Sequence, residues 1–208
     1  MTKTTRWWWI RHAPVINPSG HIYGQLDVEA DISDGRPYAG LGPRLPRDAI
    51  WVTTPLQRTR RTAEALMRDG GHDEPPIVEP DLMEQNFGDW QNRPHAEIYQ
   101  ALGARHPFWL SPAETRPPNG ESFVDLAERV AAVVERLSRD HAGRDIVAVT
   151  HGGTIRAALA QALALEPERA LAFVIDHVSL TRLDLIGAEG DAPAWRVGGV
   201  NLPAHLVV

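Results

Sequence analysis

An arginine and a histidine stand side by side where the first apolar run of the sequence ends. Arg11 and His12 follow directly after Trp7–Ile10. An arginine offers a planar fork of donors that suits a phosphate group. A histidine near neutral pH offers an uncharged nitrogen that can act as a nucleophile. The pair predicts chemistry on a phosphoryl group. Because such pairs are also common at loop starts, this prediction depends on further residues.

A second histidine ends another apolar run. His151 follows the segment Asp145–Thr150 and is itself followed by two glycines. The glycines allow the backbone to approach a ligand closely, and the amino end of the helix expected over residues 154–163 favours an anion. Because the carboxyl ends of parallel strands meet at one edge of a sheet, we expect His12 and His151 to lie side by side.

Two further residues fit the same chemistry. Arg58 falls in the first turn of a helix expected from Pro55 to about Arg68. A cation is disfavoured there, so Arg58 indicates an anionic partner. Glu84 precedes the segment Phe87–Trp90, and a carboxylic acid among aromatic side chains could donate a proton to a leaving group.

The elements that must position these residues alternate between strands and helices. Strands are expected over residues 6–10, 49–53, 77–78, 145–150, 179–186 and 195–200. Helices are expected over residues 55–68, 94–102, 121–140, 154–163 and 167–174, whereas the Gly- and Pro-rich residues 14–46 show little helical period. The alternation predicts an α/β fold, a three-layer α/β/α sandwich with a mostly parallel central sheet. We expect residues 1–208 to form a single domain with a loop or lid region around residues 85–120.

Five motifs, in this order, give the sequence a family resemblance. They are Arg11-His12, the segment 54–59, Glu84 with 87–90, the segment 120–122, and His151-Gly152. On these motifs the chain resembles the histidine phosphatase superfamily, which includes the phosphoglycerate mutases and acid phosphatases. No single motif is specific, but the match spans nearly the whole chain.

The resemblance implies a role for each residue. His12 would be the nucleophile that becomes phosphohistidine, and Glu84 would be first the general acid for the leaving group and then the base for water. The implied catalytic residues are His12, Glu84 and His151. The implied phosphate-binding residues are Arg11, Arg58 and His151, with Asn17 as a possible further contact. The resemblance implies neither a metal ion nor a cofactor, because arginine and histidine would stabilise the charge.

The sequence departs from the family pattern at three places. Ala13 stands where glycine is usual, which would cost about 1–2 kcal/mol if that position needs a positive φ. Asn17 lies one residue short of the usual spacing. The Gly- and Pro-rich residues 31–48 replace a longer helix, so that helix is expected to be shortened or missing.

Three functions are compatible with these residues. The first is hydrolysis of a small phosphorylated metabolite, as in the small-molecule phosphatase branch that includes α-ribazole phosphatase. The second is a cofactor-dependent phosphoglycerate mutase, which the lack of a long insertion between Asp89 and Asn119 disfavours. The third is a phospho-ligand binding protein with weak turnover, which the intact set of candidate residues disfavours.

Composition excludes several other classes. The net charge of −6 argues against a nucleic-acid partner, which would select a basic face. The absence of cysteine excludes a disulfide scaffold and a thiolate nucleophile. Trp7–Ile10 is too short for a signal peptide or a membrane span, so we expect a cytoplasmic protein with no membrane partner. Nothing in the sequence indicates an oligomeric state.

Overall fold

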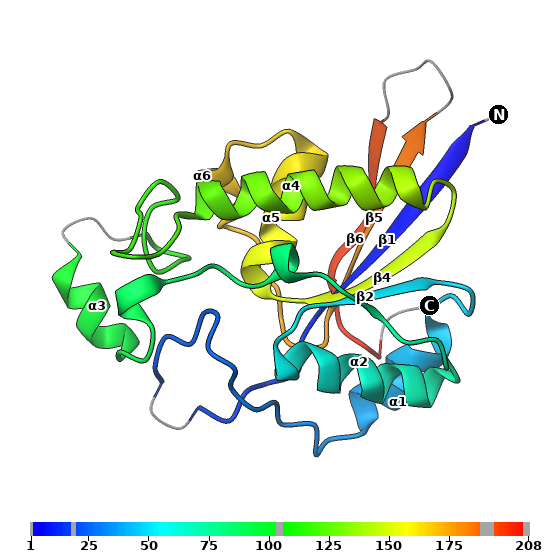
Figure 1. The fold of residues 1–208 in the computed structure, drawn as a ribbon, viewed down its shortest axis with the longest axis horizontal. Helices are drawn as coiled ribbons and strands as arrows, with labels where there is room; N and C mark the ends of the chain where they lie inside the picture. Colours follow the sequence, from blue (N-terminus) through cyan, green and yellow to red (C-terminus); the bar gives the residue numbers. More distant parts are fainter. Residues whose placement is uncertain (1, 18–19, 103–105, 188–193, 206–208) are drawn as a thin grey trace.

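A computed structural model describes residues 2–17, 20–102, 106–187 and 194–205 of the chain. A six-stranded sheet in the order β3-β2-β4-β1-β5-β6 lies between helices on both faces (Figure 1). The strands are β1 (Lys3–Arg11), β2 (Ile50–Thr53), β3 (Ile77–Val78), β4 (Asp145–Thr150), β5 (Leu180–Gly187) and β6 (Ala194–Leu202). The predicted three-layer α/β/α architecture is confirmed.

The sheet is parallel except at one edge. β1 and β2 both pair in parallel with β4, and β3 pairs in parallel with β2. β5 is antiparallel to β1, and β6 is antiparallel to β5. The beginning of β5 therefore lies at the same edge of the sheet as the carboxyl ends of β1, β2 and β4.

The tryptophan run of β1 serves both faces of the sheet. Trp7 and Trp9 are fully buried on one face, with ring centroids 4.7 Å apart. Trp8 points to the other face and is only partly buried, and its indole N–H donates to Asp145 over 2.9 Å. The strand is thus enclosed on one face and partly open on the other.

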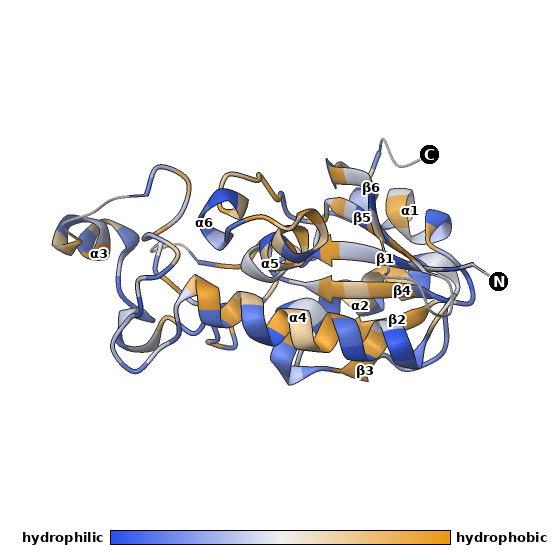
Figure 2. Cartoon of the chain, turned by 90° about the horizontal axis from the view of Figure 1, so that it is seen from above, coloured by the Kyte–Doolittle hydropathy of each residue, from blue (hydrophilic) through white to orange (hydrophobic). Residues whose placement is uncertain are grey.

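Two groups of helices complete the layers. The helices α1 (Arg36–Leu41) and α2 (Gln57–Gly70) cover one face. The other face carries the helices α4 (Phe123–Asp140), α5 (Gly152–Leu163) and α6 (Pro167–Ala170). Apolar residues of α4 recur at helical spacing, as Figure 2 shows, and the buried ones pack against Trp7 and Ile146 of the sheet. α3 (His95–Ala101) lies apart from both layers.

Several boundaries differ from the sequence-based expectation. α6 ends at Ala170 and not at residue 174, and α5 begins at Gly152 and not at residue 154. α2 begins at Gln57 and not at Pro55, because Leu56 still has extended backbone. Residues 14–46 are not wholly irregular, since they include α1 and a 3-10 turn over Gly42–Arg44. A proline with fixed φ in the first turn of α1 starts this helix, and it buries Tyr38 and Leu41 at a spacing of three residues.

Candidate active site

The strand register brings the two predicted histidines together. Arg11, the last residue of β1, pairs with Thr150, the last residue of β4. The backbone N–H of His12 donates to the Thr150 carbonyl over 2.8 Å, which extends the pairing by one residue. The rings of His12 and His151 consequently lie 5.2 Å apart, centroid to centroid, and both side chains are buried. The expectation that they lie side by side is confirmed.

The hydrogen bonding of His12 defines which ring nitrogen is free. Its Nδ1 lies 2.6 Å from the backbone carbonyl oxygen of Ala13. A carbonyl can only accept, so Nδ1 carries the proton and Nε2 keeps its lone pair. This arrangement holds the ring in place with Nε2 available to attack an electrophile.

His151 is held from the neighbouring strand. Its Nε2 lies 3.1 Å from the hydroxyl of Thr54, which follows β2. Thr54 in turn contacts the hydroxyl of Thr59 in α2 over 2.8 Å. The carboxyl ends of β2 and β4 are thereby joined through side chains, and Nδ1 of His151 stays without a partner among the described residues.

Backbone carbonyls of other segments fix the two predicted arginines. The guanidinium of Arg58 donates to the carbonyls of Leu26 and Gly24 over 2.7 and 2.5 Å. Arg11 donates to the carbonyl of Ile175 over 2.6 Å. Each guanidinium is held by neutral oxygens and not by a carboxylate, so its charge stays available for an anion.

Buried nitrogen atoms without a hydrogen-bond partner gather at this place. Seven buried side-chain atoms among the described residues have no hydrogen-bond partner, and three of them are Nε of Arg11, Nε of Arg58 and Nδ1 of His151. Buried polar groups are normally paired. Their concentration here indicates a site built to receive acceptor oxygens.

The electrostatics keep both histidines neutral. Burial lowers the pKa of His12 well below its usual range, and the guanidiniums of Arg58 and Arg11 lower it further. Burial likewise lowers the pKa of His151, with Arg58 as the next cause. At neutral pH His12 therefore keeps the lone pair that a nucleophile needs.

Glu84 reaches the same edge of the sheet from the connection between β3 and α3. Its Oε2 accepts the backbone N–H of Gly153 over 3.2 Å, at the amino end of α5. A Cβ at position 153 would lie 2.1 Å from Oε1 of Glu84, so only glycine leaves room for the carboxylate. Gly153, the second glycine after His151, is thus required because the Glu84 carboxylate packs against it.

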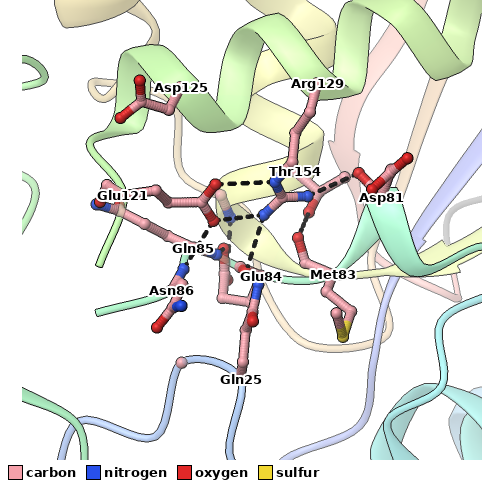
Figure 3. A network of polar contacts seen from close by, with 12 residues as sticks. Gln25, Asp81, Met83, Glu84, Gln85, Asn86, Glu121, Asp125, Arg129 and Thr154 are labelled. Carbon is pink, nitrogen blue, oxygen red and sulfur yellow. Dashed lines mark hydrogen bonds and ion pairs between the residues drawn. The ribbon is translucent and has the colours of Figure 1, made fainter. Parts of the chain in front are cut away.

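A network of polar contacts holds the backbone at and near Glu84 (Figure 3). Arg129 of α4 forms an ion pair with Glu121 over 2.7 Å and donates to the backbone carbonyl of Glu84 over 3.0 Å. Glu121 also accepts the backbone N–H of Asn86 over 2.8 Å. The network fixes the chain on both sides of Glu84 and gives Glu121, from the motif at 120–122, a positioning task.

A pocket of about 170 Å³ opens next to Arg11 and Glu84. Its other walls are mostly aromatic and aliphatic, formed by Ile22, Tyr23, Gly24, Phe87, His95, Trp109 and Leu110. Residues 22–24, 84–95 and 109–110, which come from separate parts of the sequence, therefore enclose the space beside Arg11. A small leaving group with an apolar body fits these walls.

Asn17 and Ala13 do not have the surroundings that the sequence analysis considered for them. Both ends of the Asn17 side-chain amide bind the backbone of His21, over 2.8 and 3.2 Å, so this side chain closes its own loop. Ala13 is buried and is not among the residues with positive φ. The strain considered for an alanine at this position therefore does not arise.

Three residues near the histidines were not predicted. The ring of His177, just before β5, lies 5.2 Å from that of His12, and its Nδ1 contacts the His12 carbonyl over 2.8 Å. The guanidinium of Arg58 lies 5.0 Å from the ring centroid of Tyr23. Arg156 lies in α5. Only Arg156 had a sequence signal, since it is a cation near the start of a helix, as Arg58 is.

Neither a metal site nor a membrane-spanning helix is found among the described residues. No group of three or more His, Cys, Asp or Glu side chains there could hold a metal ion. No described helix is both long and apolar enough to span a membrane.

Similarity to known proteins agrees with this geometry. The model of the histidine phosphatase superfamily (branch 1) matches residues 7–197. Glucosyl-3-phosphoglycerate phosphatase of Mycobacterium tuberculosis is 34% identical over 217 residues, covering 95% of this chain and 94% of that protein. Adenosylcobalamin/alpha-ribazole phosphatase of Salmonella typhimurium is 25% identical over 185 residues, covering 86% and 90% respectively. The structure of mycobacterial glucosyl-3-phosphoglycerate phosphatase superposes with a TM-score of 0.82 at 27% identity, covering 97% of this chain and all of that chain.

An α/β sheet whose carboxyl edge carries two buried histidines beside two arginines is the arrangement of a phosphoryl-handling enzyme. The chain belongs to the histidine phosphatase superfamily, since the family model covers nearly its whole length.

Proposed function

We propose that this protein is a metal-independent phosphatase that hydrolyses phosphomonoesters of small metabolites through a phosphohistidine at His12. The observation that carries the proposal is the buried pair His12 and His151 between Arg11 and Arg58, whose unpaired nitrogens suit phosphoryl oxygens. The relatives that are named phosphatases of small phosphorylated metabolites support the same substrate class. A cytoplasmic location accords with such substrates.

In the first step, Nε2 of His12 attacks phosphorus and the bond from phosphorus to the ester oxygen breaks. Arg11, Arg58 and His151 bind the phosphoryl oxygens and stabilise the charge of the transition state. Glu84 donates its proton to the departing alkoxide, so the leaving group departs as an alcohol. Asn17 would require a rearrangement of its loop to contribute, because its amide binds His21.

In the second step, water attacks the phosphohistidine. The Glu84 carboxylate, which released its proton in the first step, now accepts one from this water. The bond from Nε2 to phosphorus breaks, and inorganic phosphate leaves. The region around residues 85–120 contributes Phe87 and Trp109 to the pocket walls, and we propose that it selects the leaving group.

Rapid quenching with labelled p-nitrophenyl phosphate tests the proposal. The wild type should yield an acid-labile, base-stable phosphoprotein, and His12→Ala should yield none. The steady-state activity should persist in EDTA. Label trapped on another residue, or an activity that EDTA abolishes and one divalent ion restores, would contradict the mechanism. Transfer of phosphate to 3-phosphoglycerate in place of water would indicate a mutase.

A further inference from the structure

Arg156 lies beside the active site but has no place in the mechanism above. Its Nε donates to the backbone carbonyl of Phe173 over 2.9 Å, and its guanidinium carbon lies 4.7 Å from the ring centroid of Trp109. Arg11 donates to the carbonyl of Ile175, two residues further on. One segment, 173–175, therefore anchors both guanidinium groups, and the aromatic wall of the pocket covers one of them.

The two arginines border the same backbone position. A Cβ built on Gly152 would lie 3.1 Å from Nη1 of Arg156 and 3.5 Å from Nε of Arg11. The side chain of Arg156 thus extends back along α5 to the amino end of the helix, where anions are favoured. The guanidinium of Arg156 contacts the ring of Trp109, and Trp109 also lines the pocket for the leaving group.

The charge of Arg156 is not balanced within the protein. Among the described residues, no carboxylate lies within ion-pair distance of its guanidinium, and neither terminal nitrogen has a hydrogen-bond partner. Burial lowers the pKa of Arg156 to about 10, although Glu84 acts against this shift, so the group is charged at neutral pH. A partly buried cation held by a carbonyl and a ring leaves a defined place for an anion.

We propose that Arg156 forms a subsite for a carboxylate carried by the leaving group, so that the preferred substrates are alkyl phosphates with a carboxylate close to the ester oxygen. The proposal rests on the proposed phosphatase function. A carboxylate fits the planar fork of an arginine in a way that a hydroxyl does not. Arg156 thereby becomes a specificity-determining residue and not part of the phosphoryl transfer.

The charge balance of the site supports a second anion. Arg11, Arg58 and Arg156 carry three positive charges, and a phosphoryl dianion balances two of them. Glu84 must be protonated to act as the general acid, so it contributes no negative charge at that stage. Asp27 is a further carboxylate that acts on Arg58, whereas Arg156 has no ion-pair partner among the described residues. A carboxylate on the leaving group would neutralise Arg156.

A pair of substrates that differ at one carbon tests this subsite. 3-Phosphoglycerate carries a carboxylate where glycerol 3-phosphate carries a hydroxymethyl group, and p-nitrophenyl phosphate carries neither. The wild type should favour 3-phosphoglycerate over glycerol 3-phosphate in kcat/KM. Arg156→Gln should reduce kcat/KM for 3-phosphoglycerate by about 10–100-fold, the range of a charge-assisted hydrogen bond. It should change the values for the other two substrates less than threefold, and Arg156→Lys should recover part of the loss.

Two controls separate a carboxylate subsite at Arg156 from a general effect of removing an arginine and from a failure of the phosphatase function. Arg139→Gln, an exposed arginine of α4, should leave all three substrates unchanged. In the His12→Ala background, calorimetry should show that Arg156→Gln abolishes the preference for 3-phosphoglycerate in Kd, which needs no turnover. Equal losses on all three substrates, or a wild type without preference in both assays, would overturn the subsite. A wild type that binds with the expected preference but hydrolyses none of the three would contradict the phosphatase function alone.

Discussion

His12 and His151 illustrate which side-chain contacts can be predicted from sequence. Each histidine directly follows an apolar strand, and parallel strands that are neighbours in a sheet place such residues at one edge. Arg156 and His177 were missed because their contacts depend on the path of segment 173–177. The one local signal was that Arg156 is a cation near the start of a helix. The positions of site residues next to strand ends can thus be predicted from sequence. The positions of residues that reach the site from other segments cannot.

Glu84 gives the sharpest prediction at the residue scale. Glu84→Gln should slow hydrolysis of alkyl phosphates by about 10²–10⁴-fold, because an alkoxide needs a proton as it leaves. p-Nitrophenolate is a good leaving group, so the rate with p-nitrophenyl phosphate should fall far less. Steady-state kinetics with both substrates measures this difference.

Asp89→Asn is the matched control for Glu84→Gln. Asp89 lies in the same connection but is exposed, and the Asn119 amide donates to both of its oxygens over 3.2 and 3.1 Å. Its substitution should leave both substrates unaffected. If Asp89→Asn instead slowed only the alkyl phosphates, the role of the general acid would move to Asp89.

At the scale of elements, two connections hold the site together. Gln25, in the connection before α1, donates to the Glu84 carbonyl over 2.9 Å, and the neighbouring carbonyls of Gly24 and Leu26 bind Arg58. The sequence predicted strands and long helices because their apolar periods are clear. It did not locate α1, since this six-residue helix buries only Tyr38 and Leu41 and its flanks are rich in Gly and Pro. The expectation of a shortened helix over residues 31–48 agrees with α1.

The carboxyl end of α5 offers a test of backbone strain. Ala164 caps the helix in the left-handed region with φ 50°, and it is exposed. An L-residue with a Cβ pays about 1–2 kcal/mol there, whereas glycine tolerates this conformation at some entropic cost. Ala164→Gly should therefore raise the free energy of unfolding by about 0.5–1 kcal/mol in urea denaturation.

A second alanine makes that test specific. Ala132 is an exposed residue in the interior of α4, where the backbone is helical. Ala132→Gly should lower the free energy of unfolding by about 1 kcal/mol. If both substitutions destabilised the protein equally, the left-handed cap at Ala164 would not be a source of strain.

On the scale of the whole molecule, the charge of the site opposes the charge of the chain. The formal net charge is −6, yet the edge of the sheet gathers Arg11, Arg58 and Arg156 near Glu84, with Asp27 also close to Arg58. A local positive potential on an acidic molecule attracts small anions while the rest of the surface repels polyanions. The argument from net charge against a nucleic-acid partner stays a prediction, and net charge carries no information about this local cluster.

Four histidines determine how the free energy of unfolding responds to acid. Burial lowers the pKa of His12, His95, His151 and His177, the last to about 4. In the unfolded chain these histidines titrate near 6.5, so below that pH the unfolded state binds protons that the folded state does not. The free energy of unfolding should therefore fall as the pH decreases from about 6.5 toward 4.

His177→Asn isolates one contribution to this acid sensitivity. The asparagine amide can replace the Nδ1–H that donates to the His12 carbonyl, but it does not titrate. Between pH 7.5 and 5, the variant should lose about 2 kcal/mol less stability than the wild type, since a 1.5-unit interval below 6.5 corresponds to that energy. The exposed His205→Asn should keep the wild-type pH dependence in urea denaturation. If His177→Asn kept it too, His177 would titrate alike in both states, and the acid sensitivity would have to come from His12, His95 and His151.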